Sequence, residues 1–212
     1  MDKNKTGTGG CSLLNKKFIY ILKNQLAKKI LACETCIQFL PNKPKPIFQF
    51  NENSRILIIG QAPGQKVHDA GIPFLDKSGE TLRRWLGVTE EQFYTPSLFA
   101  IVPMGFCYPG KGKTGDLPPR PECAPQWHEK ILKQFKHLQL TLLIGTYAQN
   151  YYLQGNRDNL TDTVKNYKKY LPAYFPLVHP SPLNFRWQAK NPWFESEVIP
   201  VLQKKVKKIL IK

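Results

Sequence analysis

The sequence predicts one α/β domain in which helices cover both faces of a central, mostly parallel sheet of four strands. Short β-branched runs alternate along the chain with segments whose apolar residues recur at helical spacing, which is typical of this three-layer α/β/α class. A chain of 212 residues can build one core of ordinary size but not two. We therefore expect a single domain over residues 13–212, preceded by a flexible tail over residues 1–12.

The spacing of the apolar residues predicts where the strands and helices lie along the chain. Four short apolar runs predict core strands at residues 55–59, 98–102, 141–144 and 175–178. Apolar residues at helical spacing predict helices at residues 13–31, 78–86, 127–135, 147–153, 161–167 and 192–209. Strands that alternate with helices in this way predict parallel pairing.

Local signals refine two helices and one loop. Ser78 is the expected N-cap of the helix at residues 78–86, and Gly87 is its expected stop. Pro200 falls inside the last helix, where we expect it to cause a kink. Residues 103–121 are crowded with Gly, Pro and Lys, and a loop of that length is usually functional.

The charge of the chain predicts a polyanionic partner. Lys and Arg number 31 against 15 Asp and Glu, a formal net charge of +16, and such a field attracts nucleic acid. No apolar run approaches the roughly 18 residues that cross a bilayer, so we expect no membrane partner. The first residues lack the apolar segment of a secretion signal. We expect a monomer in the cytoplasm, associated with the nucleoid.

Four cysteines form two spaced pairs, Cys33-x2-Cys36 and Cys107-x15-Cys123. Disulfides are disfavoured in a chain without an export signal, which leaves buried structural thiols or a metal site, and the metal site is favoured. The wide second pair suits a [4Fe–4S] cluster that anchors a long loop better than it suits a zinc ribbon. Structural zinc remains the alternative. The fifth cysteine, Cys11, is expected to be free.

Two segments lie at the carboxyl ends of predicted strands, where α/β ligand sites form. Residues 60–64, Gly-Gln-Ala-Pro-Gly, contain glycines that permit positive φ angles and a close backbone approach. His179 is held on a stiff turn by the Pro-Ser-Pro that follows it. No Gly-Lys-[Ser/Thr] stands at P-loop spacing, so nucleotide hydrolysis is disfavoured. The two turns can clasp a small planar group, which suggests an enzyme acting on a nucleobase.

Taken together, these motifs resemble those of the uracil-DNA glycosylase superfamily. Gly60-Gln61-x-Pro63 is similar to its opening motif, and His179-Pro-Ser-Pro-Leu183 is similar to its closing motif. With the segment Gly71-Ile-Pro-Phe74 and the two cysteine pairs, the order and spacing resemble the iron–sulfur branch, family 4, over about residues 30 to 205. The resemblance implies the fold of that superfamily, a [4Fe–4S] cluster, and DNA containing uracil or another damaged base as the partner.

The resemblance implies roles for the residues of a base pocket. His179 would donate to the carbonyl oxygen of the departing base, and Phe74 would stack on the flipped base. Gln61 is the second expected catalytic position, and the backbone of the turn would complete the pocket through Gly60, Ala62, Pro63 and Gly64.

The resemblance also implies contacts to the rest of the DNA and to the cluster. Leu183 would wedge into the duplex where the nucleotide left, and flipping costs a few kcal/mol that such contacts offset. The DNA backbone would be held by Pro180, Ser181 and Pro182, with further phosphate contacts from Lys111, Lys113 and Arg186. The cluster ligands would be Cys33, Cys36, Cys107 and Cys123.

Two departures concern the hydrolytic water. Ala62 stands where the best-known branch holds an Asp that positions water, and Gln61 stands where the iron–sulfur branch usually has a carboxylate. The reaction can proceed without them, because stabilising the departing base anion is the dominant effect and one good donor contributes ~3 to 4 kcal/mol. His68 and Asp69 follow the turn either as water-orienting groups or as ordinary loop residues.

Two further departures concern the target base. Gly64 stands where a Tyr blocks the thymine methyl in the best-known branch, and Pro103 stands where the iron–sulfur branch places an Asn that reads uracil. The resulting hypothesis is a monofunctional DNA glycosylase for uracil or a related deaminated base, because no activated Lys nucleophile is evident. The rival is a nucleic-acid-binding protein that keeps the fold and the cluster but has lost catalysis.

Overall fold

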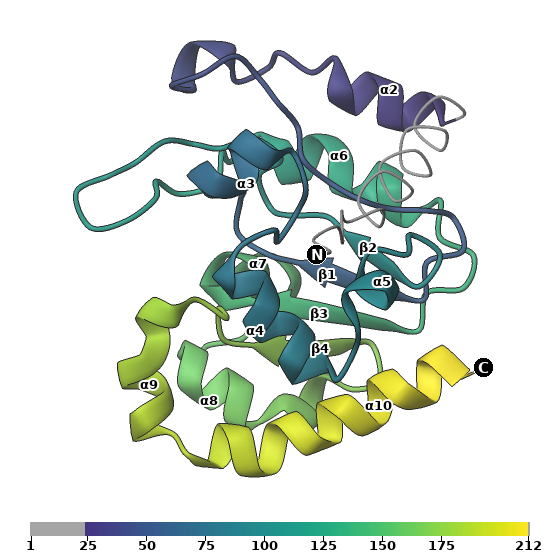
Figure 1. Cartoon of the computed structure of the whole chain (residues 1–212), viewed down its shortest axis with the longest axis vertical. Helices are drawn as coiled ribbons and strands as arrows, with labels where there is room; N and C mark the ends of the chain where they lie inside the picture. Colours follow the sequence, from purple (N-terminus) through teal and green to yellow (C-terminus); the bar gives the residue numbers. More distant parts are fainter. Residues whose placement is uncertain (1–23, 212) are drawn as a thin grey trace, which may run out of the picture.

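The protein is built around a parallel sheet. The computed structural model describes residues 24–211, and its strands lie in the order β2-β1-β3-β4 with every neighbouring pair parallel (Figure 1). The strands are β1 (Ile56–Ile59), β2 (Phe99–Ile101), β3 (Leu140–Ile144) and β4 (Tyr174–Leu177). The four predicted strands and the predicted fold class are confirmed.

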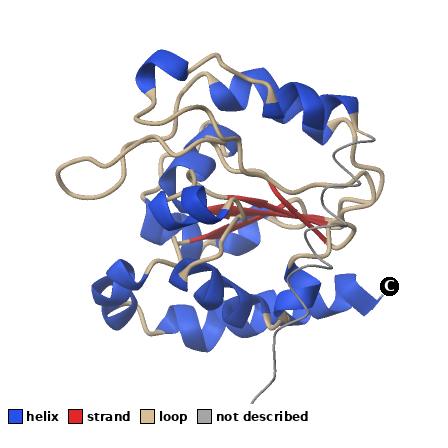
Figure 2. Ribbon diagram, turned by 45° about the horizontal axis from the view of Figure 1, so that its top comes forward, coloured by secondary structure: helices blue, strands red, loops and turns tan. Residues whose placement is uncertain are grey.

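Helices cover both faces of this sheet (Figure 2). The α-helices are α2 (Gln25–Leu31), α3 (Gln65–Ala70), α4 (Lys77–Leu86), α5 (Glu90–Phe93), α6 (Cys123–Leu132), α7 (Gly145–Tyr152), α8 (Leu160–Lys165), α9 (Phe185–Lys190) and α10 (Ile199–Ile211). Shorter turns of helix are η1 (Ile37–Phe39), η2 (Tyr167–Tyr170), η3 (Pro182–Asn184) and η4 (Phe194–Val198). Within residues 24–211, no helix combines the length and the apolar character needed to cross a membrane.

Alternate strand residues build two hydrophobic cores, because successive side chains of a strand point to opposite faces. Ile56 and Ile58 pack on the face covered by α4, α8 and α10, where Trp85 and Leu202 are fully buried. Burial of each such side chain stabilises the fold by roughly 1.5–3 kcal/mol.

The opposite face is covered by α2, α6 and α7. Leu57 and Ile59 pack there with Ile30 of α2, Trp127 of α6 and Ala148 of α7. This second core ties the segment that carries Cys33 and Cys36 to the sheet. The predicted helix at residues 13–31 is described only from residue 24 onward, and its earlier part lies outside the described residues, as do the predicted tail and Cys11.

Two predicted helix starts were wrong. The N-cap of α4 is Asp76 and not Ser78, because the Asp76 carboxylate accepts the Gly79 N–H at 2.9 Å. Gly87 ends this helix as expected, with φ +68°. Helix α6 begins at Cys123 rather than at residue 127, and Pro125 is accommodated in its first turn, where no N–H donor is required.

Close to Pro200, where a kink was predicted, the helical hydrogen bonding changes from π to α. The expected helix at residues 192–209 is divided into η4 and α10, and Pro200 is the second residue of α10. Proline has no N–H for the carbonyl four residues earlier, that of Ser196, so the regular ladder is interrupted at this point.

The carboxyl ends of β1, β2 and β4 meet at one edge of the sheet because the strands are parallel. Residues 60–64, 103–121 and 179–183 follow these three ends. Figure 1 shows the loop at residues 109–118 and helix α9 projecting from the same side of the molecule, at the left. The fold therefore brings the sequence motifs to a common edge.

Candidate active site

A pocket of about 390 Å³ opens at this edge of the sheet. Its volume lies in the range typical of small-molecule sites. The pocket is lined by Ile47, Gly60, Gln61, Ala62, Pro63, Gly64, Val67, Pro73, Phe74, Asp76, Ser78, Ile101, Pro103, Asp116, His179, Ser181 and Leu183. All the residues predicted for the base pocket and both predicted catalytic positions therefore lie around a single cavity.

The turn after β1 is fixed by the loop after β2. The Met104 N–H donates to the Gly60 carbonyl at 2.8 Å, and the Gly105 N–H donates to the Gln61 carbonyl at 2.9 Å. The expected positive φ angles are absent, since neither Gly60 nor Gly64 is among the described glycines with positive φ. Gly60 is required for space instead: a Cβ there would lie 3.3 Å from Cζ of Phe74.

Phe74 has a strained backbone. Its φ of +56° is the only positive φ among the non-glycine residues of the described chain, and such a conformation costs an aromatic residue roughly 1–3 kcal/mol. The neighbouring turn is held by the Tyr94 hydroxyl, which donates to the Pro73 carbonyl at 3.0 Å. A Cβ on Gly79 would lie 1.8 Å from the Phe74 carbonyl oxygen, so that close approach requires glycine. The surrounding contacts thus enforce the strain and aim the ring over Gly60.

The hydrogen bonds of His179 determine its tautomer. The Ser181 N–H donates to Nδ1 of His179 at 3.2 Å, so the proton of the neutral ring is on Nε2. The Asn184 side chain also donates to the His179 carbonyl at 2.7 Å, which braces the turn. The ring is therefore held with a single N–H available to a ligand.

Burial lowers the pKa of His179, while the carboxylates of Asp76 and Asp116 act in the opposite direction. The imidazole is consequently neutral at pH 7 and presents its Nε2–H as a donor without carrying a charge. A neutral N–H donor stabilises the transition state when it lies where negative charge develops on a leaving group. Because it is uncharged, it forms no ion pair with an anion in the ground state.

Two carboxylates that line the pocket were not predicted from the sequence. Asp76 lines it from the start of α4, and Asp116 lines it from the 103–121 loop. The pKa of Asp116 is raised by burial and is lowered in part by Lys111 and His179. Asp116 lies in the 103–121 loop, which was predicted to be functional. Asp76 was not predicted because Ser78 was chosen as the N-cap of α4.

A separate buried network positions Pro103. Nε2 of His128 donates to the Pro103 carbonyl at 3.0 Å, since that carbonyl can only accept, and Nδ1 then accepts from the Tyr152 hydroxyl at 2.7 Å. Burial lowers the pKa of His128 to about 4. Neither His128 nor Tyr152 was singled out from the sequence, because their roles depend on tertiary contacts.

The rim of the pocket carries exposed apolar side chains. Leu183 is 81% exposed and Phe185 is 61% exposed, which is unusual for large apolar residues. The Arg186 guanidinium lies 5.6 Å from the centre of the Phe185 ring. Ser181 accepts the Leu183 N–H on its Oγ at 3.2 Å, so its hydroxyl hydrogen is available to an outside acceptor.

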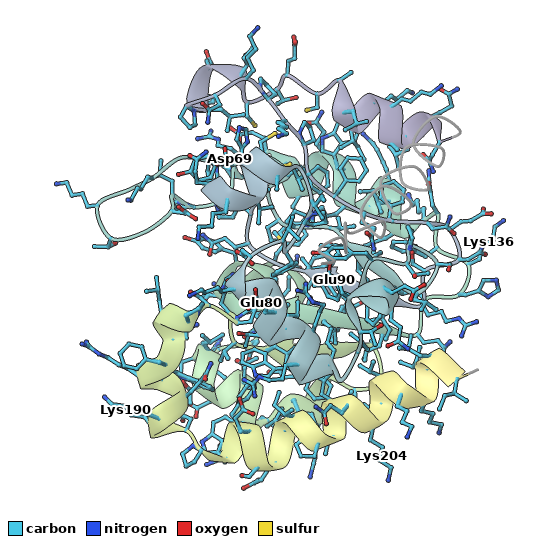
Figure 3. All side chains as sticks on the ribbon, viewed as in Figure 1. Asp69, Glu80, Glu90, Lys136, Lys190 and Lys204 are labelled. Atoms are coloured by element: carbon cyan, nitrogen blue, oxygen red, sulfur yellow. The ribbon has the colours of Figure 1, made fainter. Side chains whose placement is uncertain are left out.

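Other predicted residues lie away from the cavity. His68 packs near the Tyr108 ring, and Asp69 accepts from Gln65 at 2.8 Å, so neither lines the pocket. Asp69 lies on α3 in Figure 3. The side chains predicted to contact phosphate are exposed and do not line the cavity, with Lys111 and Lys113 on the projecting loop and Arg186 on α9. Pro180 is buried and Pro182 is exposed.

The four cysteines converge on a second cavity. Cys33, Cys36, Cys107 and Cys123 all line it, and burial raises the pKa of Cys107 to about 11 and that of Cys123 to about 12. Within residues 24–211, no three His, Cys, Asp or Glu side chains are placed so that they could hold one metal ion. Neither the predicted cluster nor the zinc alternative is therefore confirmed by the arrangement of these side chains.

The surroundings of the cysteines suit anionic sulfur. The buried Nε1–H of Trp127, which lines this cavity, has no hydrogen-bond partner among the described residues. The Phe106 N–H donates to Sγ of Cys123 at 3.4 Å. Burial and the Glu122 carboxylate, which accepts from Sγ of Cys36 at 3.7 Å, raise the pKa of Cys36, and the Arg120 guanidinium offsets part of that shift. In an iron–sulfur cluster each thiolate binds a different iron and N–H donors commonly face the sulfur atoms, so this donor set fits such a group.

Comparison with known proteins agrees with the geometry. The family model described as the uracil DNA glycosylase superfamily matches residues 47–203, which include both pocket motifs. The type-4 uracil-DNA glycosylase of Thermotoga maritima is 22% identical over 163 residues, a region that covers 74% of this chain and 80% of that protein.

Replacing Gly79 by Ala should destabilise the protein and displace Phe74. The added methyl group overlaps the Phe74 carbonyl, and overpacking of this kind costs about 1–3 kcal/mol. Urea unfolding of Gly79→Ala should report that loss, with Ser78→Ala, on the same helix turn, as the control. Equal stability of the two variants would contradict the proposed close contact.

The stability of the protein should decrease as the pH falls from about 6.5 to about 4. His128 has an unfolded pKa near 6.5 and a folded pKa of about 4, so the unfolded state binds its proton first and about 3 kcal/mol is lost over that window. His128→Gln keeps a donor to Pro103 but does not titrate. Its unfolding free energy, measured by urea denaturation at each pH, should vary less steeply than that of the wild type, and identical slopes would refute the assignment.

Proposed function

The chain belongs to the uracil DNA glycosylase superfamily, and on that premise we propose that it is a monofunctional DNA glycosylase for uracil or a related deaminated base. As a member it is a hydrolase acting on N-glycosyl bonds. The observation that carries the proposal is the convergence of Phe74 and His179, from segments more than a hundred residues apart, on one pocket sized for a small ligand.

The pocket supplies the two interactions that the reaction needs most. The base would leave the duplex and stack on Phe74, while the Nε2–H of His179 would donate to its carbonyl oxygen. As the bond between C1′ and the base nitrogen breaks, the electron pair moves onto the base, and the donor stabilises that negative charge. No lysine is found among the described residues that line the pocket, which is consistent with the proposed direct hydrolysis.

The surface around the pocket supports a DNA partner. Leu183, exposed at the rim, would fill the space left by the flipped nucleotide, and Ser181 would donate its hydroxyl to a phosphate. Lys111 and Lys113 lie on the loop that carries Asp116, and Arg186 lies on α9, close to Leu183 in the sequence. Lys190, labelled in Figure 3, is also exposed on α9, and Lys204 is exposed farther away on α10. The net charge of +16 adds a long-range attraction to the phosphate backbone.

A [4Fe–4S] cluster is proposed as the cofactor, held by Cys33, Cys36, Cys107 and Cys123. Its contribution would be structural, since it would join the segment after α2 to both ends of the loop that borders the pocket. Trp127 and Phe106 would donate N–H groups to its sulfur atoms, and Arg120 would offset part of its negative charge. Structural zinc is the alternative outcome.

Removal of the His179 side chain should abolish most of the activity. His179→Ala should slow single-turnover release of uracil by about 10²–10³-fold, because one oxyanion donor is lost. The assay uses single- and double-stranded oligonucleotides containing uracil, hypoxanthine or xanthine, followed by alkaline cleavage of the abasic sites. The control is His137→Ala, which removes an exposed histidine away from the pocket. A wild type as inert as His179→Ala on every base would favour the rival, a binding protein without catalysis.

Protein purified without oxygen should be brown and contain roughly four iron and four sulfide per chain. Cys107→Ala should lose the iron, whereas Cys11→Ala should keep it. Metal analysis that finds one zinc and no iron would replace the cluster by the structural-zinc alternative.

A further inference from the structure

The pocket lacks a carboxylate at the two positions where its relatives are expected to carry one. Position 61 is an amide and position 62 is a methyl group, and neither can accept a proton from water. Hydrolysis nevertheless requires that a water molecule add to C1′ and lose a proton. A carboxylate elsewhere in the pocket would accelerate this step by accepting that proton.

Two carboxylates are found among the described residues that line the pocket, Asp76 and Asp116. One oxygen of Asp76 is engaged in structure, because Oδ1 accepts the Gly79 N–H at 2.9 Å and caps α4. The carboxylate of Asp116, by contrast, takes part in no hydrogen bond or ion pair within the part of the chain that the structure describes. It faces Gly64, where an added Cβ would lie 3.2 Å from Oδ2 of Asp116.

The backbone around Asp116 is ordered by its own hydrogen bonds. Lys111 and Asp116 form an isolated antiparallel bridge. The Leu117 N–H donates to the Gly110 carbonyl at 2.8 Å, and the Gly112 N–H donates to the Gly115 carbonyl. The carboxylate therefore borders the cavity from a tight turn of the 103–121 loop, and His179 borders it from the turn after β4, with an electrostatic interaction between the two side chains.

We propose that Asp116 is the catalytic carboxylate that binds and activates the hydrolytic water, a role that rests on the proposed glycosylase function. The base leaves with the electron pair of the N-glycosidic bond and is stabilised by His179. The water oxygen forms the new bond to C1′, and its proton passes to the Asp116 carboxylate and then to solvent. Gly64 leaves the space in which the carboxylate and the water can meet.

The ionisation of Asp116 makes this role measurable. Burial raises its pKa, so as the pH falls its carboxylate becomes protonated at a higher pH than the carboxylate of an exposed Asp does. The groups that influence it are Lys111 and His179, and it in turn raises the pKa of Tyr108. The single-turnover rate should therefore fall as the pH is lowered through the pKa of Asp116, because the protonated carboxyl cannot accept a proton.

The test compares wild type, Asp116→Asn and Asp69→Asn in single-turnover cleavage of a uracil-containing oligonucleotide from pH 4.5 to 8. Asp116→Asn should be slower by on the order of 10²–10³-fold and should lose the acid limb of the profile. Asp69→Asn changes a carboxylate of α3 outside the pocket and should behave as wild type. Affinity for DNA containing 2′-fluoro-2′-deoxyuridine, which resists cleavage, should be nearly equal for all three proteins.

The outcomes separate the inference from the proposed function. A wild type inert on every base defeats the proposed function and the inference with it. An active wild type with an equally active Asp116→Asn defeats the inference alone. Asp116→Asn that loses binding and cleavage by the same factor, or that keeps the acid limb, also overturns it, because the carboxylate would then act in binding or folding.

Discussion

The active-site geometry depends on the pairing of β3 with both β1 and β4. In register, Ile58 of β1 lies opposite Leu142 of β3, which lies opposite Phe175 of β4. This parallel arrangement fixes the carboxyl ends of β1 and β4 two strands apart on the same edge, so Gly60 and His179 face a common space. The same pairing is buried on both faces by the two cores, and the separation of the two turns is therefore determined by the most stable part of the fold.

The local conformations at the site have a different origin. Phe74 has a left-handed backbone, which the missing side chain of Gly79 accommodates, and the adjacent Pro73 carbonyl is bound by the Tyr94 hydroxyl. His179 has a defined tautomer because a backbone N–H two residues later occupies Nδ1. In both cases contacts within the fold orient the side chain that would contact the base. The two side chains are therefore preorganised, because the free-energy cost of orienting them is offset during folding and not during the reaction.

Much of this arrangement could be predicted from the sequence. A strand such as that at residues 55–59 can be predicted because burial on both faces makes it a continuous apolar run. The motifs at Gly60 and His179 could be placed at an edge of the sheet because each follows such a run. The N-cap of α4 was misassigned because Asp76 and Ser78 are both good capping residues and only the hydrogen bond distinguishes them. Asp116 and His128 could not be identified, since a carboxylate in a Gly-rich loop and a histidine in a helix acquire meaning only through contacts distant in sequence.

The position of Asp116 in an exposed loop means that sequence changes in this loop can alter the pocket. Cys107 and Cys123 delimit a segment whose two ends converge on one cavity, while its middle projects into solvent. Insertions or replacements near the tip at residues 112–115 can therefore move the nearby carboxylate relative to the ligand without altering any strand or either core. A scaffold of this kind can change the polar groups around its pocket through short length changes in one exposed turn, while the strands and both cores stay the same.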